Sequence, residues 1–334
     1  MSFRTTVGCA LLLTGVAAGT SRAQGVPIVA LITKTESNPY FVKMREGAAA
    51  AARSTGAMLV TAAGKSDGDN AGQVTAIENM IAAGAKAILI TPSNAKAILP
   101  AIKKARAKGI LVIALDSPTD PPDATDALFA TDNYQAGVLI GRYAKAALGS
   151  KPAKIVTIDL MPGHPVGAQR HNGFLKGFGL AAPDAKTNTL GKPTGVVCMA
   201  DGFGDQSKGQ AAMENCLQKS PDVNVVYTIN EPTAAGAYKA IKAAGKEKNV
   251  ILVSVDGGCQ GVRDVGAGAI AATAQQYPVH MAELGVAAAM TFIKTGKKPS
   301  GFTDTGVALV SAKPIAGIES KDVKAGLESC FGKK

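Results

Sequence analysis

Five segments of the chain place carboxylate or amide side chains after short apolar runs. They are residues 38–41, 116–117, 230–232, 256–258 and 275–278. Carboxylates accept hydrogen bonds from hydroxyl groups, amides both donate and accept, and an aromatic ring offers an apolar face. This combination suits a polyhydroxylated ligand. One Asp or Asn at such a position could equally cap the helix that follows, but five together favour a binding site.

The motifs of nucleotide binding and of metal binding are missing from the sequence. Gly202-Phe203-Gly204 is not followed by the third glycine of a dinucleotide fingerprint, and GxxxxGK[ST] does not occur. His164, His171 and His280 have no base–nucleophile partner, so we expect them to be structural or exposed. No Cys/His spacing is typical of a metal site. We therefore expect a binding protein that is not an enzyme and uses no cofactor and no metal.

The elements that must position the five segments alternate between apolar, β-branched runs and Ala-rich stretches. Strands are predicted at residues 28–32, 58–61, 87–91, 111–115, 128–130, 155–158, 196–198, 225–229, 251–255 and 270–273. Helices are predicted between them, at 41–54, 70–83, 95–107, 136–148, 167–178, 207–218 and 233–244. Continuous apolar strands that alternate with helices indicate parallel sheets covered on both faces. The two series of strands predict an α/β protein with two doubly wound lobes. Ligands of such sheets bind beyond the carboxyl ends of the strands, where the five segments lie.

Length and charge agree with this organisation. The chain has 334 residues, 46% of them hydrophobic, and a net charge of +11. This length suggests two domains. Lys and Arg are scattered, without the interleaved aromatics of a nucleic-acid surface, so we expect no nucleic-acid partner. After the first 25 residues no apolar stretch approaches the roughly 18–20 residues needed to span a bilayer.

The N-terminus has the pattern of a secretory signal. Arg4 precedes an apolar stretch at residues 7–18, and Ser21 and Ala23 place small residues at both recognition positions. We expect residues 1–23 to be removed; a buried helix or a retained anchor is the alternative. Cys9 precedes the apolar stretch, which argues against a lipoprotein.

Four cysteines remain in the mature chain: Cys198, Cys216, Cys259 and Cys330. An even number in an exported protein makes disulfides plausible, with three possible connectivities. We pair Cys198 with Cys216, which flank one predicted strand–helix unit, and this leaves Cys259 with Cys330 at the C-terminal tail. Free buried thiols are the alternative.

Asn38-Pro39-Tyr40-Phe41 resembles the Asn-Pro-aromatic-Phe signature of ribose-type periplasmic sugar-binding proteins, the receptors of ABC importers. The resemblance covers the whole mature chain. Its further motifs occur in the same order, at residues 88–92, 131–133, 169–170, 230–231, 255–257 and 274–278. Residues 254–259, together with Cys198 and Cys216, are most similar to the fructose-binding members.

The resemblance implies a set of substrate-binding residues: Asn38, Tyr40, Phe41 and Asp116 from the first lobe, and Arg170, Phe203, Asn230, Asp256 and Gln276 from the second lobe and hinge. Phe203 would be the second lobe's stacking ring, although the spacing beside it differs by one residue. Ser117 departs from the pattern, because ribose receptors carry Arg directly after this Asp. Losing that bidentate donor favours a different or larger monosaccharide than ribose.

The resemblance also implies the type I periplasmic binding protein fold. Three crossovers near Thr131, Tyr277 and Thr303 would join an N-terminal lobe (27–130 plus 277–303) to a C-terminal lobe (131–276 plus 304–334). The protein would be a periplasmic monomer that closes on one monosaccharide and delivers it to a membrane permease with its ATPase. Fructose is the first candidate, followed by ribose, mannose and xylose. A receptor for chemotaxis or a sensor kinase, or one for a non-sugar polyol, is the alternative.

Overall fold

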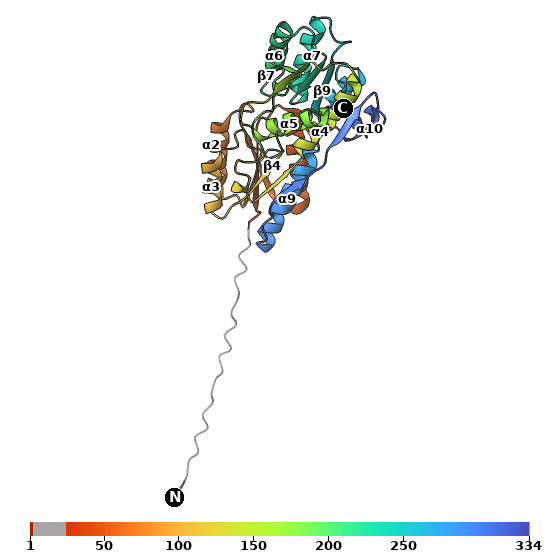
Figure 1. Ribbon diagram of the computed structural model, residues 1–334. Helices are drawn as coiled ribbons and strands as arrows, with labels where there is room; N and C mark the ends of the chain where they lie inside the picture. The colour runs from red at the N-terminus through yellow and green to blue at the C-terminus, as the bar shows by residue number, and fades with distance from the viewer. Residues whose placement is uncertain (3–24, 334) are drawn as a thin grey trace.

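The computed structural model describes residues 1–2 and 25–333 (Figure 1). The expected secretory signal and its cleavage site lie outside the described residues. No helix of the described part is both long and apolar enough to cross a membrane.

The N-terminal lobe is built on a six-stranded parallel sheet, in the order β11-β5-β4-β3-β1-β2. Its strands are β1 (Ile28–Thr33), β2 (Met58–Ala63), β3 (Ala87–Ile90), β4 (Leu111–Leu115), β5 (Ala127–Ala130) and β11 (Phe302–Asp304). Its helices are α1 (Pro39–Thr55), α2 (Asn70–Ala82), α3 (Leu99–Ala107) and α9 (Pro278–Thr295), with a 3-10 turn at Pro122–Ala124.

Successive side chains of β1 show how this sheet is covered on both faces. Val29 and Leu31 belong to the core under α1 and α9, whereas Ala30 and Ile32 belong to the core under α2 and α3. All four side chains are fully buried. A strand buried on both faces has no polar position to alternate with, which explains the continuous apolar run in the sequence.

The C-terminal lobe repeats this architecture around a second six-stranded sheet, in the order β12-β10-β9-β8-β6-β7, in which only β12 is antiparallel. Its strands are β6 (Ile155–Asp159), β7 (Val196–Asp201), β8 (Val225–Thr228), β9 (Ile251–Asp256), β10 (Ala272–Gln275) and β12 (Ala308–Ser311). Its helices are α4 (Asn133–Leu148), α5 (Pro165–Phe178), α6 (Gln206–Lys219), α7 (Glu231–Ala243), α8 (Cys259–Gly266) and α10 (Val323–Ser329).

The chain passes between the two sheets three times. The crossings are at residues 131–132, 276–277 and 305–307, after β5, β10 and β11 respectively. Figure 1 shows the result: α2, α3, β4 and α9 lie in one lobe, and β7, β9, α6 and α7 lie in the other. The expected fold, two doubly wound lobes of the type I periplasmic binding protein kind, is confirmed.

Two disulfides are present, and both lie in the C-terminal lobe. Cys198 on β7 is bonded to Cys216 on α6, with their Cα atoms 5.7 Å apart. Cys259 at the start of α8 is bonded to Cys330, directly after α10, with their Cα atoms 4.9 Å apart. The second bond therefore fastens the C-terminal tail to the loop that follows β9.

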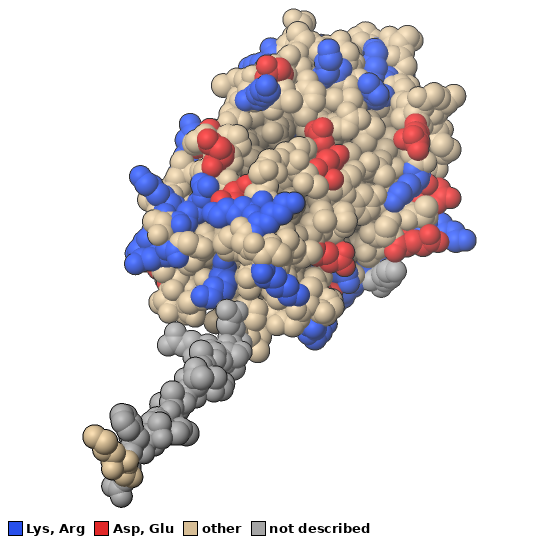
Figure 2. Space-filling view, turned by 90° about the horizontal axis from the view of Figure 1, so that it is seen from below, with Lys and Arg blue, Asp and Glu red and all other residues tan. Residues whose placement is uncertain are grey.

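The face of the molecule seen in Figure 2 carries charged side chains of both signs. The densest basic run of the sequence, residues 103–108, is on α3 and just after it. Within it, Lys104 pairs with Glu78 at 2.8 Å and Arg106 with Asp126 at 3.1 Å. Acids on neighbouring segments thus partner these two cations.

Candidate functional site

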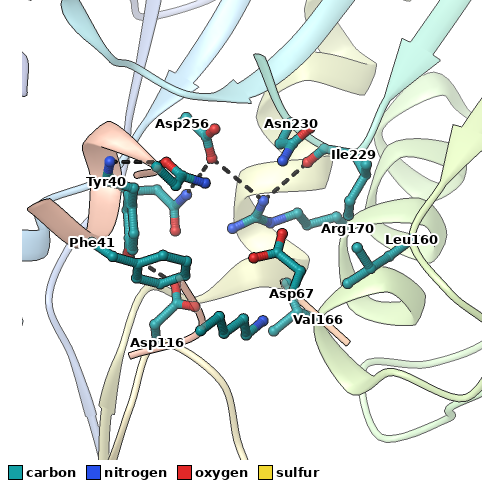
Figure 3. Close-up of a pocket in the computed structure, with 13 residues that line it drawn as sticks. Tyr40, Phe41, Asp67, Asp116, Leu160, Val166, Arg170, Ile229, Asn230 and Asp256 are labelled. Carbon is teal, nitrogen blue, oxygen red and sulfur yellow. Dashed lines mark hydrogen bonds and ion pairs between the residues drawn. The ribbon is translucent and has the colours of Figure 1, made fainter. Parts of the chain in front are cut away.

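A cavity lies between the two lobes, at the carboxyl ends of their strands. It is lined by thirteen residues: Lys34, Asn38, Tyr40, Phe41, Asp67, Asp116, Leu160, Val166, Arg170, Ile229, Asn230, Asp256 and Gln276. Figure 3 shows their side chains converging from both lobes. Three carboxylates, two cations and three amides thus surround a space with one aromatic ring pair and a few aliphatic groups at its wall.

The N-terminal lobe contributes an aromatic–carboxylate pair. Tyr40 and Phe41 lie in the first turn of α1, and their rings meet edge to face with centroids 5.4 Å apart. The Tyr40 hydroxyl donates to Asp116 Oδ1 at 2.8 Å. Burial and the Asp116 charge raise the pKa of Tyr40 well above its usual value, so the phenol keeps its proton and acts as the donor.

Asp116 is held in a backbone conformation that most residues avoid. It follows β4 with φ +63°, in the left-handed region that Asp tolerates better than most other residues. The buried Ser117 hydroxyl donates to Asp116 Oδ2 at 2.9 Å. Both oxygens of the carboxylate are therefore oriented, and their remaining lone pairs can accept from a ligand hydroxyl.

The C-terminal lobe contributes a buried arginine that is fixed on several sides. Arg170 Nε donates to Asn133 Oδ1 at 2.7 Å, and its Nη1 donates to the Ile229 carbonyl at 2.9 Å. Nη1 also lies 3.7 Å from Asp256 Oδ1. The backbones of α5 and α4 lie so close together that a Cβ at Gly137 on α4 would collide with the Arg170 carbonyl on α5. A fixed guanidinium can offer its remaining N–H groups to a ligand without first losing side-chain freedom.

Asp256 ends β9 and is oriented by Gln276, whose amide nitrogen donates to Asp256 Oδ1 at 3.1 Å. The Gln276 side chain is almost fully buried, yet its Oε1 has no hydrogen-bond partner within the described chain. A buried acceptor without a partner is costly. A ligand hydroxyl in the cavity would satisfy it.

A further carboxylate, Glu231, neighbours Asp256 but does not line the cavity. Its oxygens accept from the backbone N–H groups of Gly257 and Gly258, at 2.8 and 2.9 Å, and from the Thr273 hydroxyl at 2.7 Å. These bonds hold the turn that follows β9. Burial, together with the Asp256 charge, raises the pKa of Glu231 to about 8. Burial also raises the pKa of Asp256 to about 7, although the nearby Arg170 charge lowers it.

Eight of the nine substrate-binding residues expected from the sequence line this cavity. Asn38 and Asn230 are also helix caps, accepting from Tyr40 N and Thr233 N, so the capping interpretation applies to both of them. Phe203 lies outside the cavity lining: it has φ +53°, its side chain is 39% exposed, and the Lys208 ammonium lies 4.4 Å from its ring centroid. The apolar residues that the second lobe contributes to the lining are aliphatic: Leu160, Val166 and Ile229.

Five lining residues were not predicted from the sequence: Lys34, Asp67, Leu160, Val166 and Ile229. Lys34 is the most informative, because its side chain is buried and its Nζ lies 3.4 Å from His164 Nε2 of the other lobe. Burial, followed by the charges of Lys34 and Arg170, lowers the pKa of His164 well below its usual value, so a neutral imidazole faces the ammonium. Lys34 directly follows β1, so the strand-end rule that found Asp116 could also have found it.

The donors and acceptors of this site suit recognition of an uncharged polyol. Within the described residues, no group of three or more His, Cys, Asp or Glu side chains is arranged to hold a metal ion. Carboxylates face guanidinium and ammonium groups across the cavity, and each hydroxyl of a ligand could donate to one and accept from the other.

Comparison with known proteins decides the family. Residues 29–298 match the family described as the periplasmic binding protein domain. The chain belongs to the periplasmic binding protein family. Among its relatives, the ribose import binding protein of Haemophilus influenzae is 32% identical over 287 residues, which cover 86% of this chain and 92% of that one. The D-allose-binding periplasmic protein of Escherichia coli is 26% identical and covers 80% and 85% of the two chains.

Solved structures of the family share the fold along most of the chain. A periplasmic solute binding protein of an ABC transporter from Actinobacillus succinogenes, with bound D-allose, aligns with a TM-score of 0.75 and 26% identity, covering 85% of this chain and 97% of that one. A carbohydrate transporter solute binding protein from Agrobacterium radiobacter, in complex with D-arabinose, aligns with a TM-score of 0.77 and 25% identity, covering 93% and 100%. These relatives are binding proteins rather than enzymes, as expected for this chain.

Proposed function

We propose that the protein is the exported receptor of an ABC importer and binds one monosaccharide between its two lobes. The observation that carries the proposal is the interlobe cavity, in which Asp116, Asp256 and Arg170 present oriented acceptors and donors beside the unpartnered Gln276 Oε1. The relatives support the class of ligand, because they are described as binding ribose and allose. The leader expected from the sequence and the periplasmic relatives support export to the periplasm.

The two lobes would open and close about the three crossings of the chain. Residues from both lobes line the cavity, so a sugar that contacts both would stabilise the closed state over the open one. The loaded, closed receptor would then meet a membrane permease and its ATPase as a monomer. The substrate-binding roles of the eight lining residues predicted from the sequence, and of Lys34 and Asp67 beside them, are part of this proposal.

Fructose is the first sugar to test, with ribose, mannose and xylose after it. Ser117, which stands where ribose receptors carry Arg, is buried and bonded to Asp116 rather than directed into the cavity. Lys34 adds a buried donor group to the N-terminal lobe's part of the cavity lining. A donor that is relocated in this way favours a sugar whose hydroxyls are placed differently from those of ribose.

A thermal-shift screen of the purified exported protein against monosaccharides and polyols tests the proposal, with calorimetry on the hits. A sugar at 100 times its Kd should add about 2.7 kcal/mol to the unfolding free energy, which is visible as a higher melting temperature. A large shift with one sugar supports the proposal and names the ligand. If no sugar or polyol raises the melting temperature or gives binding heat, the proposed function is wrong.

A further inference from the structure

The C-terminal tail of the protein contacts both lobes, although it is not one of the three segments in which the chain crosses between them. It leaves α10 and is bonded through Cys330 to Cys259, at the start of α8 in the C-terminal lobe. Cys259 N donates to the Phe331 carbonyl at 2.8 Å, and Phe331 forms a parallel bridge with Gly258. The backbone of the tail therefore belongs to the C-terminal lobe, beside the turn that follows Asp256.

The side chain of Phe331 belongs to the other lobe. Its ring packs edge to face against Tyr40, with centroids 5.2 Å apart and an angle of 85° between planes. It is only 5% exposed and forms part of the hydrophobic core under α1 and α9. Tyr40 in turn lines the ligand cavity and donates to Asp116. One ring thus contacts the back of a cavity residue across the interlobe boundary.

We propose that Phe331 is a positioning residue of the ligand site, carried on the tail of one lobe, that seats Tyr40 of the other lobe and favours the closed arrangement. The Cys259–Cys330 disulfide fixes the backbone beside this ring to the C-terminal lobe. The proposal rests on the proposed function, because the closed arrangement is the one that holds the ligand.

The contact between the Phe331 and Tyr40 rings should stabilise the closed arrangement. An aromatic pair at this geometry adds interaction beyond the burial of its surface. Because the backbone of Phe331 is fixed to the C-terminal lobe, separating the lobes would pull its ring from the N-terminal core. The contact is therefore stronger in the closed than in the open state, which is the condition for a residue to shift that equilibrium.

The test compares Phe331→Ala with the wild type and with Phe302→Ala, whose ring is 53% exposed on β11. For Phe331→Ala we expect a roughly three- to tenfold higher Kd for the sugar, arising from faster dissociation in stopped flow. Phe302→Ala should leave the Kd and the dissociation rate unchanged. Phe331→Leu, which keeps an apolar side chain, should restore part of the affinity and replaces Phe331→Ala if that variant does not fold.

A second comparison uses the two disulfides as matched controls. Removing Cys259–Cys330 with paired Ser substitutions should raise the Kd as Phe331→Ala does, whereas removing Cys198–Cys216 should lower the melting temperature and leave the Kd unchanged. Small-angle scattering should show a larger radius of gyration for ligand-free Phe331→Ala than for ligand-free wild type.

The proposal is overturned if Phe331→Ala lowers the melting temperature but binds and releases sugar as the wild type does, because Phe331 would then only stabilise the fold. It is also overturned if the two disulfide variants bind sugar equally well. If the wild type itself binds no sugar, the proposed function fails, and the scattering comparison of the ligand-free proteins still decides whether Phe331 favours closure.

Discussion

The hydroxyl of Tyr40 donates a 2.8 Å hydrogen bond to Asp116 Oδ1, and so links the first turn of α1 to the end of β4. The two residues are 76 positions apart in the sequence. Parallel strands bring them together because β1 and β4 end at the same edge of one sheet, separated only by β3. The aromatic wall and the carboxylate of the N-terminal lobe therefore form one unit.

Tyr40→Phe tests this unit, because it removes the hydroxyl and keeps the ring that packs on Phe331. Asp116 would lose one of the two donors that orient it, the other being Ser117. We expect sugar binding to weaken by about 0.5–1.5 kcal/mol, measured by calorimetry. Tyr134→Phe, whose hydroxyl lies at the Pro183 carbonyl outside the cavity lining, should bind normally. Equal affinity of Tyr40→Phe and wild type would show that Asp116 does not need this donor.

Asp116→Ala and Asp256→Ala test the two carboxylates on opposite sides of the cavity. Each replacement should cost about 2–3 kcal/mol of binding, a roughly 30- to 160-fold higher Kd, because ligand hydroxyls lose a charged acceptor. Asp123→Ala, at an exposed site of the N-terminal lobe, is the control. Circular dichroism should show all three variants folded. Undiminished affinity in either cavity variant would remove that residue from the ligand site.

The fold could be predicted because its strands are buried on both faces. β4 is a continuous apolar run, and β6 and β9 are apolar except for Thr157, Ser254 and the Asp at the end of each; all three were recognised with bounds within a residue or two. β11 was not predicted, since Phe302, Thr303 and Asp304 are all exposed and form no apolar run. Local sequence carries little information about an edge strand of this kind, whose pairing partner, β5, lies more than 170 positions earlier in the chain.

The part of the candidate site that could be predicted consists of polar residues at the carboxyl ends of strands and in the loops that follow them. Asp116 and Asp256 stand at strand ends, Asn38 stands in the loop between β1 and α1, and the structure places all three in the cavity lining. Phe203 was placed by resemblance across a one-residue difference in spacing, and its ring lies instead beneath the Lys208 ammonium. Lys34 directly follows β1 and was missed although the strand-end rule applies to it; its burial and its contact with His164 of the other lobe are visible only in the structure.

Lys34→Met tests whether this buried ammonium serves the ligand. The ammonium of Lys34 lies 3.4 Å from its hydrogen-bond partner, His164 Nε2, and burying a poorly partnered charge costs stability. Met should therefore leave the ligand-free melting temperature unchanged or higher. Sugar binding should weaken by about 1.5–3 kcal/mol if a ligand oxygen accepts from Nζ. Lys103→Met, at an exposed site on α3, is the control. A loss of stability without loss of affinity would assign Lys34 to the fold instead.

The buried carboxyls Glu231 and Asp256 predict a pH dependence of stability. Burial raises their pKa values to about 8 and about 7, whereas both titrate near pH 4 in an unfolded chain, roughly the usual range for Asp and Glu. Between about pH 4 and pH 7 the folded protein thus binds more protons than the unfolded chain, and these two groups make the unfolding free energy fall as the pH rises. His164 opposes them below about pH 6.5, because the folded protein holds it neutral while the unfolded chain protonates it.

Urea unfolding of the wild type and of Asp256→Asn, measured from pH 5 to pH 8, isolates the carboxyl contribution because His164 is common to both proteins. Asp256→Asn removes one of these carboxyls and also the charge that raises the pKa of its neighbour Glu231. The difference in unfolding free energy between variant and wild type should therefore grow in favour of the variant by about 1 kcal/mol or more between pH 5 and pH 7. Parallel curves for the two proteins would mean that Asp256 is ionised throughout this range, with the Arg170 charge outweighing its burial.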